Sequence, residues 1–250
     1  TGMINEQNRM DIMTNNLANA STVGYKKEGS TSQSFDDVLT VKIKDQSVGM
    51  RNVQRLGVKN PGVKIGENYT DYSQGSFRIT GNTYDLALSG EGFFAIEFTN
   101  KAGETDTKYT RAGQFTLNKD GYLVTEEGDY VLDTQNRRIR LNTLIDSSIT
   151  DDGTIYQNGQ AVAKIQVTDF EDYDYLEKYG ETYYQPIQGA KTIAAKAQVK
   201  SGYLEMANVQ IVSEMVNLIS ITRAYESNQK VVQTIDDTLD VAVNQIGRVQ

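Results

Sequence analysis

The last 43 residues of the chain, 208–250, contain no proline, and their first glycine is Gly247. Apolar or small side chains recur there four and three positions apart, the heptad spacing of an α-helix that packs along one stripe against another helix. These side chains belong to Ile211, Met215, Leu218, Thr222, Tyr225, Val232, Leu239, Val243 and Ile246, with interruptions at Gln229 and Asp236. The spacing predicts a helix about 55 Å long, at about 1.5 Å per residue, with Asn208 as its N-cap.

A second helical pattern opens the sequence. Met3, Met10 and Leu17 lie seven positions apart, and Met13 and Ala20 occupy the intermediate positions. We expect this helix to end near Ala20, where asparagines and a later glycine favour a helix exit. It would pair with the C-terminal helix as a coiled-coil core. Because Thr1 already lies inside the pattern, we also expect residues to precede it.

Between the two helices the sequence reads as strands and turns. Residues 25–72 alternate only briefly and predict an extended connecting segment. From 73 to 204 the apolar period is two and turn signals recur regularly, which predicts an all-β domain. The expected fold class is therefore α+β. Its four parts are an N-terminal core helix (1–24), the connecting segment (25–72), the β domain (73–204) and a C-terminal core helix (205–250).

Composition excludes several classes of function. The chain has no cysteine and no histidine, so it has no disulfides, no Cys or His metal ligands and no nucleophile that relies on a thiol or imidazole. The net charge is −8 and no basic groove pattern is present, which argues against nucleic acid as a partner. No run of 18 apolar residues exists to insert into a membrane. We expect no enzyme activity and no catalytic, cofactor-binding or metal-binding residues.

Other chemical readings of local motifs are weaker than the structural ones. The Asp-rich turns at 118–121 and 151–153 lack the ligand order of a calcium loop, and adjacent Asp pairs point in different directions rather than across a sugar cleft. Gly90-Glu91-Gly92 lacks the rest of a phosphate-loop pattern. The tyrosines at 173–184 fit a packing layer, with carbohydrate binding as the alternative. For Asp172–Gly180 we expect a single helical turn.

The C-terminal helix carries more apolar surface than one partner helix covers. Val209, Val212, Val216 and Ile219 form a second stripe beside the heptad. A helix that is apolar on several faces is not stable when exposed to water. The surplus surface favours contacts with other subunits over burial in a single large domain.

Three blocks of the sequence together resemble the flagellar rod and hook family, the axial proteins of the bacterial basal body. The resemblance covers nearly the whole chain. Its motifs are Asn15-Asn16-Leu17-Ala18-Asn19-Ala20-Ser21-Thr22-Val23-Gly24-Tyr25-Lys26, then Gly90-Glu91-Gly92-Phe93-Phe94, Tyr109-Thr110-Arg111-Ala112-Gly113-Gln114-Phe115 and Asp120-Gly121-Tyr122-Leu123-Val124, and finally Ser201-Gly202-Tyr203-Leu204-Glu205, Asn208-Val209, Glu214-Met215-Val216-Asn217-Leu218-Ile219 and Arg223-Ala224-Tyr225-Glu226-Ser227-Asn228.

The resemblance implies a structural subunit of the basal-body rod, which transmits motor torque to the hook. It implies a helical homopolymer that contacts neighbouring rod and hook proteins, after export through the flagellar type III apparatus to the basal body in the cell envelope. The terminal helices are then expected to be largely disordered before assembly. Expected subunit-interface residues are Met3, Met10, Met13, Leu17, Asn19, Gly24, Tyr25, Ile211, Met215, Leu218, Ile219, Tyr225, Val232, Leu239, Val243 and Ile246.

Within the family, a length of 250 residues and a long connecting segment resemble the distal rod type, with the proximal type second. A short hook-type subunit of the same family and a secreted glycan-binding module remain as alternatives. A binding module would stay monomeric at high concentration, whereas a rod subunit would associate.

Overall fold

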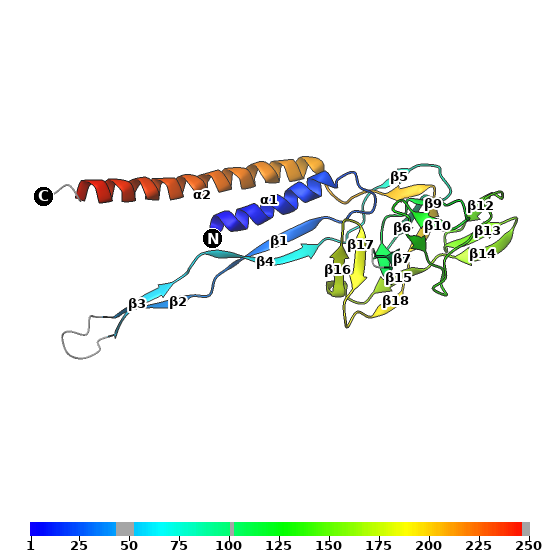
Figure 1. The fold of residues 1–250 in the computed structure, drawn as a ribbon, viewed down its shortest axis with the longest axis horizontal. Helices are drawn as coiled ribbons and strands as arrows, with labels where there is room; N and C mark the ends of the chain where they lie inside the picture. Colours follow the sequence, from blue (N-terminus) through cyan, green and yellow to red (C-terminus); the bar gives the residue numbers. More distant parts are fainter. Residues whose placement is uncertain (44–52, 101–102, 247–250) are drawn as a thin grey trace. The chain divides into compact units, whose positions relative to one another are not determined.

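Helices α1 and α2 and strands β1–β4 form one of two units in the chain, and the remaining strands form the other. The structure is a computed structural model that describes residues 1–43, 53–100 and 103–246 (Figure 1). The described elements confirm an α+β chain with a helix at each end and a strand-rich centre.

The first unit contains both long helices. Helix α1 spans Gly2–Ala18 and α2 spans Ile211–Ile246, which is 36 residues. The two pass close at Gly2, where an added Cβ would lie 3.4 Å from Nδ2 of Asn228. α2 begins three residues after Asn208, so the expected N-cap role of Asn208 is wrong. Its side chain binds the backbone of Lys27 instead, through an amide hydrogen bond of 2.7 Å.

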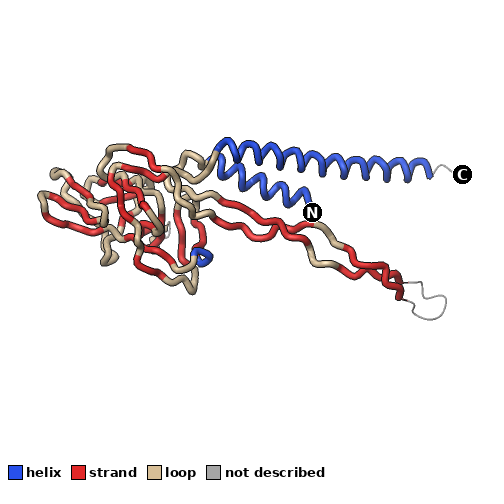
Figure 2. The backbone as a smooth tube through the Cα atoms, turned by 180° about the vertical axis from the view of Figure 1, so that it is seen from behind, coloured by secondary structure: helices blue, strands red, loops and turns tan. Residues whose placement is uncertain are grey.

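The described residues between 28 and 70 contribute two antiparallel ribbons, whose strands are red in Figure 2. β1 (Glu28–Ser34) pairs with β4 (Val63–Thr70), and β2 (Val38–Ile43) pairs with β3 (Val53–Lys59). A two-stranded ribbon is marginally stable in water by itself. Several large apolar or aromatic side chains of the two ribbons are exposed, namely Val38, Leu39, Val58, Val63, Ile65 and Tyr69.

The second unit, the β unit, comprises residues 18–27 and 72–210. Its main sheet has the strand order β16-β17-β8-β7-β11-β10-β9, with β15 bridging β7 and β18. A three-stranded sheet β12-β13-β14 and the pairs β19-β6 and β20-β5 complete it. The bounds are β5 Phe77–Ile79, β6 Leu86–Ser89, β7 Phe93–Thr99, β8 Thr105–Thr110, β9 Phe115–Leu117, β10 Leu123–Thr125, β11 Tyr130–Val131, β12 Ser147–Ile149, β13 Thr154–Gln157, β14 Gln160–Lys164, β15 Val167–Phe170, β16 Leu176–Tyr179, β17 Tyr183–Pro186, β18 Thr192–Ala194, β19 Gln198–Ser201 and β20 Tyr203–Glu205.

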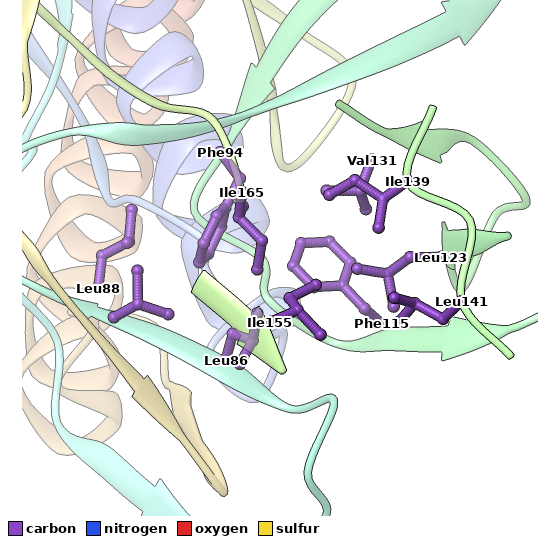
Figure 3. Packing of buried hydrophobic residues seen from close by; sticks show 11 residues of the cluster. Leu86, Leu88, Phe94, Phe115, Leu123, Val131, Ile139, Leu141, Ile155 and Ile165 are labelled. Atoms are coloured by element: carbon purple, nitrogen blue, oxygen red, sulfur yellow. The ribbon is translucent and has the colours of Figure 1, made fainter. Parts of the chain in front are cut away.

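Two buried clusters form the core of the β unit. The first, seen from close by in Figure 3, contains Leu86, Leu88, Phe94, Phe115, Leu123, Val131, Ile139, Leu141, Ile155, Ile165 and Val199. The second is mostly aromatic and contains Phe93, Ala95, Tyr109, Leu132, Phe170, Leu176 and Tyr184. Phe93 and Phe94 are neighbours on β7 and enter different clusters, because successive side chains of a strand point to opposite faces.

The hairpin between β13 and β14 shows how turn residues set the local backbone. Asn158 and Gly159 have φ of 51° and 76° there, in the left-handed region that a two-residue hairpin turn requires. The helical turn expected for Asp172–Gly180 forms only in the first part of this segment. A short 3₁₀ helix at Tyr173–Tyr175 leads directly into strand β16, because Leu176 packs into the second core cluster while β16 pairs with β17.

Candidate functional site

Three charged side chains meet in the interior of the β unit. Nζ of Lys26 lies 2.6 Å from Oε1 of Glu205, and Nη1 of Arg111 lies 3.3 Å from Oε2 of the same carboxylate. The side chains of Lys26, Glu205 and Arg111 are 1%, 0% and 3% exposed. We call these three residues the charge junction.

Backbone groups add further hydrogen bonds to the charge junction. Nζ of Lys26 donates to the carbonyl oxygen of Ser73 at 2.7 Å, and the amide of Gly75 donates to Oε1 of Glu205 at 3.0 Å. The amide of Gly24 donates to the carbonyl oxygen of Glu205 at 2.8 Å. A buried charge is tolerated only when it is paired and hydrogen-bonded. Removing one partner of such a cluster costs about 3–5 kcal/mol.

Two glycines allow the close approach of backbones at the charge junction. Gly24 has a φ of 70°, and a Cβ there would overlap the backbone of Ala112. A Cβ on Gly75 would overlap the carbonyl oxygen of Met206. Asn208 lies next to this contact and donates from Nδ2 to Ser73. The segments 24–27, 73–75 and 205–208 are thus held together by both charge and shape.

Asparagines perform a similar task in the first unit. Nδ2 of Asn16 donates to the carbonyl oxygen of Glu28 at 2.8 Å, and its Oδ1 accepts from the Glu28 amide at 2.9 Å. Nδ2 of Asn5 donates to Oγ of Ser32 at 2.9 Å. Both asparagines are buried, together with Ile12 on the same helix. One face of α1 is therefore bound to β1 through side-chain amides.

The expected interface residues separate into three groups. Met3, Met10, Met13 and Leu17 are half-buried on α1. Asn19, Gly24 and Tyr25 are buried in the β unit, and the centroid of the Tyr25 ring lies 4.2 Å from Nζ of Lys178. The α2 residues Ile211, Met215, Ile219, Val232, Leu239 and Val243 are exposed, Leu218 and Tyr225 are half-buried, and the side chain of Ile246 lies outside the described residues.

The covered stripe of α2 differs from the predicted heptad. Glu214 and Ile221 are buried, and Leu218, Thr222, Ala224, Tyr225 and Asn228 are half-buried. Glu214, Leu218, Ile221, Tyr225 and Asn228 alternate four and three apart, which is again heptad spacing. Of the predicted heptad, Leu218, Thr222 and Tyr225 are partly covered. All described side chains after Asn228 are exposed, so the apolar surface of the second half of α2 is uncovered in the single chain.

Sequence reasoning did not identify the charge junction. Lys26, Arg111 and Glu205 each stand in one of the three sequence blocks, as a charged residue among small, aromatic or apolar neighbours. A charged residue in such surroundings was the only sequence signal that pointed to the charge junction. Charged residues are usually solvated, and nothing in the sequence states that these three meet.

The structure also bears on the chemical alternatives. Among the tyrosines at 173–184, Tyr184 and Tyr183 are buried and Tyr173 packs beside the second core cluster, whereas Tyr175 and Tyr179 are exposed. The packing reading therefore holds for Tyr173, Tyr183 and Tyr184. A glycosidase requires a carboxylic acid of raised pKa. The pKa of Asp152 is instead lowered, chiefly by the hydrogen bond from the Thr150 hydroxyl and then by that from Thr154.

Neither membrane insertion nor a metal centre is indicated by the described residues. No helix there is both long and apolar enough to span a bilayer. No group of three acidic side chains in the same residues is placed to hold a metal ion.

Comparisons with known proteins identify the family. Three family models match in order along the chain: "Flagella basal body rod protein" at residues 1–26, "Flagellar hook protein FlgE/F/G D1 domain" at 87–159 and "Flagellar basal body rod FlgEFG protein C-terminal" at 200–246. All three residues of the charge junction lie inside these matches: Lys26 in the first, Arg111 in the second and Glu205 in the third.

Whole-length relatives agree with the family models. The chain is 34% identical to the flagellar basal-body rod protein FlgG of Bacillus subtilis, over 98% of this chain and 96% of the relative. It is 33% identical to the rod protein FlgF of Caulobacter vibrioides, over 96% and 92%. The FlgG of the same organism is 34% identical, over 96% and 94%. We conclude that the chain belongs to the flagellar basal-body rod protein family and is a structural subunit of the rod in the flagellar basal body.

Proposed function

We propose that the chain is a distal-type rod subunit that polymerises with copies of itself into the hollow axial shaft. In this proposal α1 and α2 pair as a coiled coil and form the inner part of the tube. The ribbons β1–β4 and β2–β3 contact neighbouring subunits, and the β unit forms the outer wall. The shaft would pass motor torque to the hook.

The uncovered apolar surface of α2 carries this proposal. Val212, Val243 and Leu239 are 77%, 70% and 59% exposed. Val231, Val232, Ile235 and Val241 in the second half of the helix are exposed as well. Apolar patches of this extent mark interaction sites, and burial stabilises by about 25 cal/mol per Å² of apolar surface. Copies of the same helix supply a complementary heptad stripe.

Export and partners follow from family membership. We infer that the subunit leaves the cell unfolded through the flagellar type III apparatus and then contacts neighbouring rod and hook proteins. The absence of cysteine throughout the sequence is compatible with passage as an unfolded chain, because no disulfide has to form or break on the way. The assignment to the distal rather than the proximal type is supported by the FlgG relatives and by the length of the connecting segment 25–72.

Sedimentation velocity over a range of concentrations tests the assembly role. We expect the full chain to associate as its concentration rises and Leu239→Glu to remain monomeric, because a carboxylate cannot be buried unpaired in the contact. Gln233→Glu adds the same charge at another exposed position of α2 outside the predicted heptad stripe, and it should associate nearly as the parent does. If Leu239→Glu associates like the parent chain, the apolar stripe does not drive assembly.

A further inference from the structure

We propose that Glu205 is a positioning residue that fixes segments 24–27 and 205–208 to the β unit in the free subunit. The two segments lead out of the β unit toward the two ends of the chain. In this view, each terminal helix starts from a fixed attachment before any neighbouring subunit is present. The proposal concerns the monomer and does not depend on the assembly proposed above.

The contacts of Glu205 combine parts of the chain that are far apart in sequence. Its carboxylate accepts from Lys26, from Arg111 and from the Gly75 amide, which lie 179, 94 and 130 positions away. All of these residues belong to the β unit. A single carboxylate therefore connects the N-terminal segment, the segment before β5 and the end of β8. Lys26, Arg111 and Gly75 all lie outside helices α1 and α2.

The charge junction is continuous with the core of the β unit. The guanidinium carbon of Arg111 lies 5.2 Å from the ring centroid of Phe93, a member of the second core cluster. Leu204, next to Glu205, is 1% exposed. A cation over an aromatic face in a desolvated site is stabilised further. These contacts place the charge junction against the core, which supplies the fixed frame for the two segments.

The geometry favours a role of these charges in specificity rather than in stability. An apolar trio of similar volume is often as stable as a buried ion cluster, so stability alone does not require Lys26, Arg111 and Glu205. A carboxylate that must satisfy two cations and one amide accepts few alternative arrangements. We therefore attribute to Glu205 the selection of one arrangement of segments 24–27 and 205–208.

Amide hydrogen exchange on the dilute full-length chain tests the proposal. In the parent chain, we expect the amides of Gly24 and Gly75 to exchange within about tenfold of the core amide of Leu132, which donates to Ala95. In Glu205→Gln the amides of Gly24 and Gly75 should exchange at least about 100-fold faster, because a neutral amide leaves two buried cations without the carboxylate. The Leu132 amide should change much less.

Three further variants make the result specific. Glu97→Gln is the matched control, because Glu97 forms an ion pair with Arg138 on the partly exposed surface of the same unit, and its effect on Gly24 and Gly75 should stay within about threefold. Lys26→Met keeps the ion pair of Arg111 with Glu205, and it should accelerate exchange of the Gly24 amide by about tenfold or more. In the double variant Lys26→Met with Glu205→Gln, exchange of the Gly24 amide should be accelerated by less than the product of the two single-variant accelerations.

Several results would overturn the proposal. One is a parent chain whose Gly24 and Gly75 amides exchange as fast as those at the end of α2. Another is an equal acceleration of Gly24, Gly75 and Leu132 in Glu205→Gln, which would indicate only a general loss of stability. If Glu205→Gln does not fold, the comparison with the double variant is lost. In that case, an unchanged exchange rate of the Gly24 amide in Lys26→Met rejects the proposal by itself.

Discussion

At the residue scale, hydrogen bonds can outweigh burial in setting the charge of a side chain. Burial by itself would raise the pKa of Asp133, yet the pKa lies below its ordinary value of 3.8 because the amides of Gln135 and Arg137 and the Arg137 guanidinium donate to its carboxylate. A group with a lowered folded-state pKa stabilises the fold above its unfolded-state pKa. This contribution is lost as the pH falls through the folded-state value.

Asp133→Asn is predicted to remove this pH-dependent stability. The difference in unfolding free energy between parent and variant should be full near pH 6 and should shrink as the pH falls below about 3.8. Urea unfolding at a series of pH values measures it. Arg137→Gln keeps the two backbone donors and should show a smaller difference of the same sign. Parallel pH profiles for parent and Asp133→Asn would show that the hydrogen bonds do not favour the ionised carboxylate.

At the element scale, polar contacts hold α1 on strand β1. Asn16→Ala improves intrinsic helix propensity by roughly 0.5 kcal/mol, but it leaves the amide and carbonyl of Glu28 without the Asn16 partner, at about 1–3 kcal/mol for each buried group. The loss is larger, so we expect faster hydrogen exchange at the Glu28 amide. Gln7→Ala, at an exposed position of the same helix, should leave that amide unchanged. Equal exchange in both variants would contradict the role of Asn16.

The same scale shows what the sequence can and cannot predict. The long helix α2 and the β unit follow from apolar periods of 3.5 and two, and the turn at Asn158 and Gly159 follows from the backbone freedom of these residues. The pairing of β1 with β4 does not. β1 reads Glu-Gly-Ser-Thr-Ser-Gln-Ser and has no apolar period, so its partner is set by tertiary contacts such as those of Asn5 and Asn16.

At the scale of the whole molecule, the two units are stabilised by different means. The β unit has two core clusters and the charge junction, all inside residues 18–27 and 72–210. In contrast, the helices and ribbons of the first unit expose much of their apolar surface. The charge junction was beyond sequence reasoning because the meeting of Lys26, Arg111 and Glu205 depends on the complete fold. The exposed apolar surface of α2 could be predicted from the sequence, because a second apolar stripe lies beside the heptad.

This asymmetry predicts what happens when both helices are deleted. A chain of residues 18–210 lacks α1 and α2 but keeps both core clusters and the charge junction, so it should unfold cooperatively on heating, as followed by near-ultraviolet circular dichroism. Because the apolar stripes of α2 are gone, it should sediment as a monomer at concentrations where the full chain associates. Electron microscopy of both samples provides the control. Tubes formed by the deleted chain would show that assembly is driven by the ribbons or the β unit and not by the helices.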